Sequence, residues 1–310
     1  MKRRTTIPSS SDREPVPPLW RRLRRRVYFG LAASTLAAVR QTPASVGART
    51  CQLLAHVATV CRPRERRRAR ANLALAFPDL SRQEREQLLR RSVAALGRNL
   101  FTTLTVERMA ARNFDSVDED GALAAIAELR TSGRGVLILT GHFGCWELLG
   151  AFLAARLGGL GVVTGTIHNP SVDRLVQQQR RQLGMTPLPR DGGASPLLGM
   201  LQQGGVVAVL LDQHTRVPNV PVPFFGRPAP TTVGFAKLVL RRRIPVLPVA
   251  IATAGDGFRV IHQATVAVND LEDSDSGCDG LLRRCNESLE NFVRRNPAEW
   301  VWFHDRWATG

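Results

Sequence analysis

Short apolar runs alternate with segments of helical periodicity from about Ala122 onward. A bounded apolar run is typical of a buried strand, and alternation of such runs with helices indicates a mainly parallel sheet covered by helices. The predicted strands are 136–139, 161–164, 206–211, 245–251 and 258–268, and the predicted helices are 120–132, 145–157, 171–183, 194–203, 231–242 and 279–295. The pattern predicts an α/β fold, a mainly parallel central sheet flanked by helices.

The first hundred residues show only helical patterning. Helices are predicted at 19–40, 44–60, 64–77 and 81–100, and Ser81 with Glu84 has the spacing of a capping box. Residues 1–18 are rich in Ser, Pro and charge and are predicted to be a disordered basic lead-in. The expected organisation is this lead-in, a helical membrane-docking subdomain at 19–110 and an α/β domain at 111–310.

Positive charge is concentrated at the N-terminus. Residues 1–70 hold seventeen lysines and arginines against three carboxylates, so this segment carries +14 of the net charge of +17. The other 240 residues are nearly neutral. This asymmetry predicts an N-terminal segment that meets an anionic surface.

The apolar stretch Val27 to Val39 follows the arginine-rich run 21–26. Its thirteen residues would span roughly 20 Å as a helix at about 1.5 Å per residue, less than a ~30 Å hydrocarbon core. We therefore expect a helix that lies in the lipid head groups, with a transmembrane anchor and a cleaved signal as alternatives. No aromatic residues interleave the arginines, so nucleic acid is not the expected partner.

Several common chemistries leave no signature in this sequence. It contains no GxSxG elbow, no GxGxxG after a strand, no GxxxxGK[ST] loop and no HExxH pair. The five cysteines include no CxxC pair, which predicts neither a disulfide framework nor a zinc site and favours a reducing, cytosol-facing compartment. No metal site is expected.

The run GVLILTGHFGCWELLG places His142 on a turn between a predicted strand and a helix, with Glu147 five residues later. Gly141 and Gly144 let the chain turn tightly on both sides of the histidine. Reactive groups of open α/β sheets gather at the carboxyl ends of strands, so the pair could be a general base and the group that orients it. The alternative for an isolated pair is a turn histidine with local bonds and a solvated glutamate.

Five ordered blocks between about residues 64 and 307 resemble the family of bacterial lipid A biosynthesis (Kdo2-lipid A) lauroyl and myristoyl acyltransferases, within the lysophospholipid acyltransferase superfamily. The first holds Asn72, Leu73 and Phe77-Pro78-Asp79 with Glu84-Arg85, and the second is the HxxxxE motif GHFGCWE. The third is Asn169-Pro170 with Asp173 and Arg180, and the fourth runs from Asp212-Gln213 through PFFG (223–226) to Thr231. The fifth is Pro297 with Trp300, Trp302, His304, Arg306 and Trp307.

The resemblance implies a glycerolphosphate acyltransferase-like α/β fold and direct acyl transfer from a thioester to a hydroxyl. His142 would be the base, and Glu147 would fix its tautomer and stabilise the imidazolium. Alanine at either position is expected to abolish transfer and leave the fold intact. No cofactor is implied beyond the co-substrate, which is acyl carrier protein loaded with a fatty acid (acyl-ACP) or acyl-CoA.

The other blocks supply candidate substrate-binding residues: Arg180, Asp212, Gln213, Phe224 and Phe225. Arg180 could bind phosphate or the pantetheine linker, or be a solvated helix residue. Asp212 follows an apolar run, so it is either a site residue or a simple cap. The two phenylalanines could line an acyl channel or belong to the core. Thr231 is expected to cap the next helix.

The tryptophans at 300 and 302 should share one face of an extended segment, either as an interfacial belt or packed against the sheet. Two positions depart from the family pattern. Cys145 replaces an asparagine inside the HxxxxE motif, and Thr164-Gly165 replace a Tyr-Arg pair. That arginine would be expected near a phosphorylated acceptor, so the departure leaves the acceptor open.

The predicted function is transfer of a fatty acyl chain, with acyl-ACP as the expected donor, to a hydroxyl of a membrane glycolipid such as a lipid A precursor. The predicted location is the cytoplasmic face of the inner (plasma) membrane, peripheral or shallowly anchored, with anionic lipid and acidic acyl carrier protein as partners. One alternative is an acyltransferase on another lipid, such as a phosphatidylinositol mannoside or an aminolipid, using acyl-CoA. The other is a non-catalytic lipid- or nucleic-acid-binding relative.

Overall fold

A computed structural model of the protein describes residues 38–167, 169–190, 195–214 and 217–307. The chain divides into two compact units, residues 1–41 and 42–310. Of the first unit, residues 38–41 are described and are helical. The rest of the predicted helix at 19–40 and the disordered lead-in lie outside the described residues, and the following paragraphs concern the second unit.

Four helices precede the first strand: α2 (Ala44–Val60), α3 (Pro63–Ala76), α4 (Arg82–Leu104) and α5 (Val106–Ala111). Ser81 and Glu84 form the predicted capping box at the start of α4, with the Glu84 amide donating to the Ser81 hydroxyl and the Ser81 amide to the Glu84 carboxylate. This reciprocal bonding satisfies two amides that have no partner within the helix. Cys51 and Gly47 are the buried residues of α2, which packs on α4 through this face.

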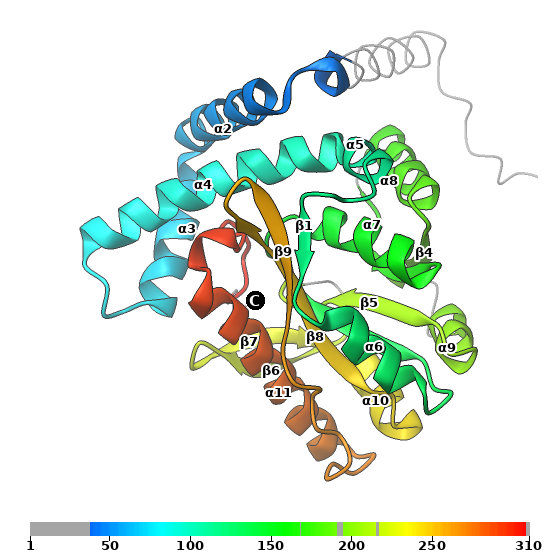
Figure 1. The fold of residues 1–310 in the computed structure, drawn as a ribbon. Helices are drawn as coiled ribbons and strands as arrows, with labels where there is room; N and C mark the ends of the chain where they lie inside the picture. The colour runs from blue at the N-terminus through cyan, green and yellow to red at the C-terminus, as the bar shows by residue number, and fades with distance from the viewer. Residues whose placement is uncertain (1–37, 168, 191–194, 215–216, 308–310) are drawn as a thin grey trace, which may run out of the picture. The chain divides into compact units, whose positions relative to one another are not determined.

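Seven strands form the main sheet, in the order β1-β9-β8-β2-β5-β3-β4. Figure 1 labels β1, β9, β8, β5 and β4 of this sheet. The strands are β1 (Val117–Glu119), β2 (Val136–Thr140), β3 (Leu160–Thr164), β4 (Met185–Pro189), β5 (Val206–Leu210), β8 (Val246–Ala254) and β9 (Gly257–His262). Pairing is parallel except between β8 and β9. The expected mainly parallel α/β sheet is therefore confirmed.

Helices cover both faces of this sheet: α6 (Ala122–Arg130), α7 (Trp146–Leu157), α8 (Pro170–Gln182), α9 (Ser195–Gln202), α10 (Gly234–Arg242) and α11 (Asp275–Arg295). Side chains alternate along β2, so that Ile138 joins a core with α6 and α7 while Leu137 and Leu139 join a core with α9, α10 and α11. A strand buried on both faces reads as a continuous apolar run, as residues 136–139 do.

A hairpin of β6 (Asn219–Phe224) and β7 (Arg227–Thr232) forms a second, two-stranded sheet. It was missed because prolines at 221, 223, 228 and 230 argue against strands. Thr231 lies in β7, where its buried hydroxyl bonds Ala229 O, and helix α10 has no side-chain cap. The prediction that Thr231 caps this helix is therefore wrong.

The C-terminal segment after η2 (Pro297–Glu299) packs its tryptophans inward. Trp300 and Trp302 are buried, with ring centroids 4.7 Å apart. The Asn72 side-chain amide donates to Trp302 O and His304 O, which ties α3 to this segment. These tryptophans belong to the core, and the alternative of an interfacial belt is wrong for both.

No helix within the described residues is both long and apolar enough to cross a membrane. Most of the apolar stretch 27–39 lies outside those residues.

Candidate active site

His142 lies just beyond β2, on the turn that leads into α7. The turn requires both of its glycines. A Cβ on Gly141 would lie 2.9 Å from the Asp212 carboxyl carbon, and Gly144 has a φ of +57° with its backbone against the Ile251 carbonyl. Side chains at these positions would push the histidine away from the sheet.

Asp212 follows β5, the parallel neighbour of β2, so both residues stand at the same edge of the sheet. The Asp212 carboxylate is bonded twice by His142: its Oδ1 lies 2.9 Å from Nδ1, and its Oδ2 accepts the backbone amide at 2.7 Å. An ionised carboxylate can only accept, so Nδ1 carries the proton and Nε2 is the free base nitrogen.

Trp300 completes the surroundings of this carboxylate by donating its indole N–H to Asp212 Oδ2 at 2.8 Å. Burial alone would raise the pKa of Asp212. The His142 and His304 rings, together with the bonds from His142 and Trp300, outweigh burial and hold the pKa well below its usual range. Asp212 is therefore an anion at neutral pH, placed to orient His142 and to stabilise its protonated form.

His304 lies beside His142, with ring centroids 5.3 Å apart, and the Gln213 side-chain amide contacts its Nε2. Burial and the charge of His142 lower the pKa of His304 to about 4. The ring is thus neutral at pH 7 and does not compete with His142 for a proton.

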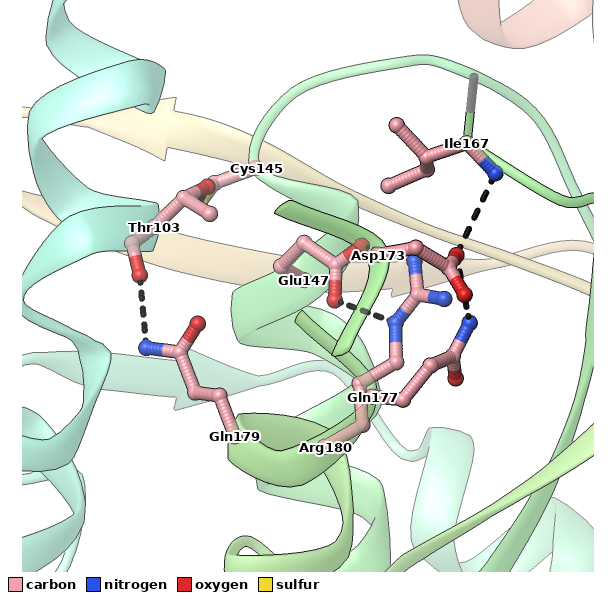
Figure 2. Close-up of polar contacts among 8 residues, drawn as sticks. All are labelled: Thr103, Cys145, Glu147, Ile167, Asp173, Gln177, Gln179 and Arg180. Carbon is pink, nitrogen blue, oxygen red and sulfur yellow. Dashed lines mark hydrogen bonds and ion pairs between the residues drawn. The ribbon is translucent and has the colours of Figure 1, made fainter. Parts of the chain in front are cut away.

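The structure gives Glu147 a different partner from the one expected. Its carboxylate receives both Nε, at 3.1 Å, and a terminal nitrogen of Arg180 (Figure 2). Asp212, and not Glu147, occupies the bonding position at His142 Nδ1. In this geometry Asp212, which follows β5, takes the position at Nδ1 that was expected for Glu147.

Helix α8 holds Arg180 in place through the third motif block. The Asn169 side chain accepts the Ser171 and Val172 amides, Pro170 is the first helical residue, and the helix buries no residue completely. Asp173 accepts the Ile167 amide at 3.2 Å, and Gln179 donates to Thr103 O in α4 at 3.2 Å (Figure 2). These bonds fix the helix against the strand loop and α4.

His142, Glu147, Arg180 and Gln213 open on one cavity of about 780 Å³ between α7 and the sheet. The polar lining residues are these four with Thr140, Thr164, Thr166, Arg190 and His214, and most of them lie at or beyond the carboxyl ends of β2, β3, β4 and β5. The apolar part of the lining includes Ile138, Leu149, Gly150, Leu153, Leu160, Val162, Met185 and Ala208. A volume of this size is typical of a small-molecule site, and its division suits a ligand with one polar and one hydrocarbon end.

Phe224 and Phe225 do not line this cavity. Both are buried, their rings pack together at 5.1 Å, and Trp307 packs on each of them. Arg306 is buried under Phe224 and bonds the hairpin and α11 through Thr231 and Asn286. Of the two alternatives for these phenylalanines, the structure therefore supports a core position and not an acyl channel.

Cys145 is buried at the start of α7, with its thiol 3.6 Å from the Thr103 hydroxyl. Burial raises the pKa of this thiol to about 12, so it is protonated at neutral pH and is not activated as a nucleophile. Among the described residues, no group of three or more His, Cys, Asp or Glu side chains could hold a metal ion.

Three contributors to the site were not predicted as site residues. Trp300 and His304 were recognised only as parts of a C-terminal motif, although a polar aromatic side chain in a buried segment often seeks a partner. Arg190 lines the cavity directly after β4, and this strand was not predicted because it contains two prolines. For Trp300 and His304, the signal in the sequence was the presence of an indole and an imidazole within one short motif.

Comparison with known proteins identifies the family. A sequence profile described as "Bacterial lipid A biosynthesis acyltransferase" matches residues 18–309. The chain belongs to this family. It is accordingly an O-acyltransferase, an assignment that rests on the named activities of its relatives.

Members of this lipid A acyltransferase family and related enzymes are among the similar proteins. A lipid A biosynthesis acyltransferase of Haemophilus influenzae is 26% identical over 77% of this chain and 74% of its own length. The lipid A biosynthesis myristoyltransferase of Escherichia coli is 25% identical over 94% and 91%. A phosphatidylinositol mannoside acyltransferase of Mycobacterium tuberculosis is 25% identical over 68% and 66%.

Proposed function

We propose that this acyltransferase moves a fatty acyl chain from acyl-ACP to a hydroxyl of a membrane glycolipid, most simply a lipid A precursor. The observation that carries the proposal is the His142–Asp212 pair at the polar end of a cavity whose other end is apolar. The acyl chain would lie in the apolar part, with its thioester beside His142.

His142 is the general base in this proposal. Nε2 takes the proton of the acceptor hydroxyl as its oxygen attacks the thioester carbonyl, and the imidazolium returns the proton to the leaving thiolate. The C–S bond breaks and an ester C–O bond forms. Asp212 orients the ring and stabilises the imidazolium, because its carboxylate is anionic and bonded at Nδ1.

Glu147 and Arg180 would act on substrate position. Each side chain is less than one-fifth exposed, and the pair lines the same cavity as His142. Glu147 holds the guanidinium in a fixed, two-point geometry. Arg180 would thereby shape the polar end of the cavity around the thioester, and Gln213 also lines this cavity.

A membrane location on the cytoplasmic face is supported by helix α2 and by the charge of the N-terminal region. Most of the large hydrophobic side chains that are exposed in the described part of the chain lie on α2: Val46, Leu53, Leu54, Val57 and Val60. Arg49 lies within α2, and Arg62 and Arg64 follow its C-terminal end in the sequence. An apolar face bordered by arginines fits the interface of anionic lipid.

Two experiments test the function. Purified protein with acyl-ACP and a lipid A precursor should form acylated product, and His142→Ala should lower the rate by at least ~10³-fold while circular dichroism and the melting temperature stay unchanged. Turnover retained by His142→Ala would contradict the mechanism.

Lipid mass spectrometry of cells that lack the gene should show a glycolipid that is lighter by one acyl chain. Loss of a chain from a phosphatidylinositol mannoside, with acyl-CoA as the competent donor, would favour the second candidate, which the similarity to the mycobacterial enzyme supports. An unchanged lipid profile, together with inactive protein, would favour a non-catalytic lipid-binding relative.

A further inference from the structure

The polar end of the cavity contains two arginines in different electrostatic situations. The charge of Arg180 is balanced by Glu147, which accepts two of its donors. Arg190 also lines the cavity, and within the part of the chain that the structure describes it forms no ion pair. Its Nε is buried and has no hydrogen-bond partner among the described residues. A buried guanidinium nitrogen without a partner carries a desolvation cost, which a ligand in the cavity could offset by bonding to it.

The backbone around Arg190 makes room for this side chain. Strands β3 and β4 are parallel neighbours, with Thr164 opposite Pro189, so Gly165 and Arg190 leave the sheet side by side. A Cβ on Gly165 would lie only 3.0 Å from a terminal nitrogen of Arg190. A larger side chain at 165 would clash with the guanidinium. Glycine at this position therefore permits the observed position of the Arg190 side chain.

We propose that Arg190 binds a phosphate group of one of the two substrates at the polar end of the cavity, an inference that rests on the function proposed above. A planar guanidinium offers two parallel N–H donors to phosphate oxygens. Thr164 and Thr166 line the cavity next to it and supply hydroxyl groups for the remaining oxygens. The site takes a phosphate monoester or diester attached to an alkyl or acyl chain.

Two substrates of the proposed reaction could carry this phosphate. The donor has a phosphodiester in its pantetheine arm, and the acceptor glycolipid can have a phosphate on its head group. Arg190 would recognise the same phosphate chemistry in both cases. Comparing donors and acceptors with and without the phosphate distinguishes the two sources.

A direct binding measurement tests the site without any turnover. The full-length protein in zwitterionic nanodiscs is titrated with octyl phosphate and with octanol by isothermal calorimetry. Arg190→Gln should weaken binding of octyl phosphate by ~10- to 100-fold and leave octanol unchanged, because a charge-assisted hydrogen bond is lost. Arg190→Lys should retain part of the affinity.

The matched control is Arg174→Gln, an exposed arginine of α8 that does not line the cavity. It should bind both probes as the wild type does. Equal affinity of wild type and Arg190→Gln for octyl phosphate would overturn the proposal, as would an equal loss for octanol, which would indicate a distorted cavity.

Transfer kinetics then identify the source of the phosphate. If the donor carries it, Arg190→Gln raises KM for acyl-ACP and has no effect with acyl-N-acetylcysteamine, which lacks phosphate. If the acceptor carries it, the variant raises KM for the phosphorylated glycolipid and not for its dephosphorylated form. No change in KM for any of these substrates would overturn the assignment to a substrate phosphate.

A wild type that binds octyl phosphate through Arg190 but transfers no acyl chain would contradict the proposed function. The phosphate site would still be supported in that case.

Discussion

His142 Nδ1 lies 2.9 Å from Asp212 Oδ1, although 70 residues of chain separate the two side chains. The neighbouring strands β2 and β5 bring them together at one edge of the sheet. This contact assigns the tautomer of His142 and makes Asp212 the residue that positions it.

Asp212→Asn should therefore lower kcat by ~10³-fold or more and change KM little, because the amide favours the wrong tautomer and cannot stabilise the imidazolium. Single-turnover transfer of a radiolabelled acyl chain measures this effect. Wild-type kcat in Asp212→Asn would remove this carboxylate from the mechanism.

Glu147 is expected to act through Arg180. Glu147→Gln and Arg180→Gln should each lower kcat/KM, and the double variant should be hardly worse than either one, with a coupling energy of about 1–3 kcal/mol. The exposed pair Asp279–Arg283 on α11 provides a control, and Asp279→Asn should leave turnover unchanged. If Glu147 instead orients His142 directly, Glu147→Gln will match Asp212→Asn in kcat, and the effect of Arg180→Gln will add to it.

Periodicity alone predicted most of the helices and the buried strands. Residues 44–60 and the strand after Gly135 have strong local patterns, and the capping box at Ser81 is a local signal. The hairpin β6–β7 and strand β4 were missed because their prolines oppose strand propensity, and tertiary packing of Phe224 and Val222 outweighs it.

The order of the strands in the sequence does not give their order in the sheet. For this reason the residues that meet at the site could be predicted only in part. His142 and Glu147 are five residues apart and were paired on that basis, whereas β5 and the C-terminal segment supply Asp212 and Trp300 from far along the chain. The role of Arg190 depends on the pairing of β3 with β4. Long-range pairing of this kind is set by the global fold and has no local signature.

His304 should make the stability of the protein pH-dependent. Its pKa is about 4 in the folded protein, against an ordinary value of 6.5, so between these values the unfolded chain binds a proton that the folded chain does not. Stability is full above pH 6.5 and falls as the pH drops, by about 2 kcal/mol between pH 7 and pH 5 for this group alone. Urea unfolding at both pH values measures the loss, and His304→Asn should show a smaller one. An identical pH dependence in the variant would show that His304 does not cause it.

The capping box at the start of α4 should contribute measurably to stability. Ser81→Ala removes the acceptor of the Glu84 amide and should lower the free energy of unfolding by about 1 kcal/mol. Gln83→Ala, an exposed change in the same turn, should have an effect within about 0.5 kcal/mol of zero. Chemical denaturation of both variants provides the comparison, and equal midpoints would argue against the cap.

Gly150 is expected to set the depth of the apolar part of the cavity. It lies against Met185 in the lining of that part, and a Cβ at this position would lie 2.7 Å from the methionine sulfur. Gly150→Ala should push the thioether into the space that the end of the acyl chain would occupy, and Met185→Ala should vacate it. Each buried methylene is worth ~0.8 kcal/mol, or roughly fourfold in relative kcat/KM.

Competition between acyl-ACP donors of ten to sixteen carbons, read by mass spectrometry of the product, measures this preference. Gly150→Ala should shift it toward shorter chains and Met185→Ala toward longer ones. Gly199→Ala provides the matched control, because a Cβ there meets no atom within 4 Å and the residue does not line the cavity. A chain-length preference that stays the same in both cavity variants would place the acyl chain elsewhere in the protein, because a hydrocarbon chain packed against Gly150 and Met185 must respond to a change in their volume.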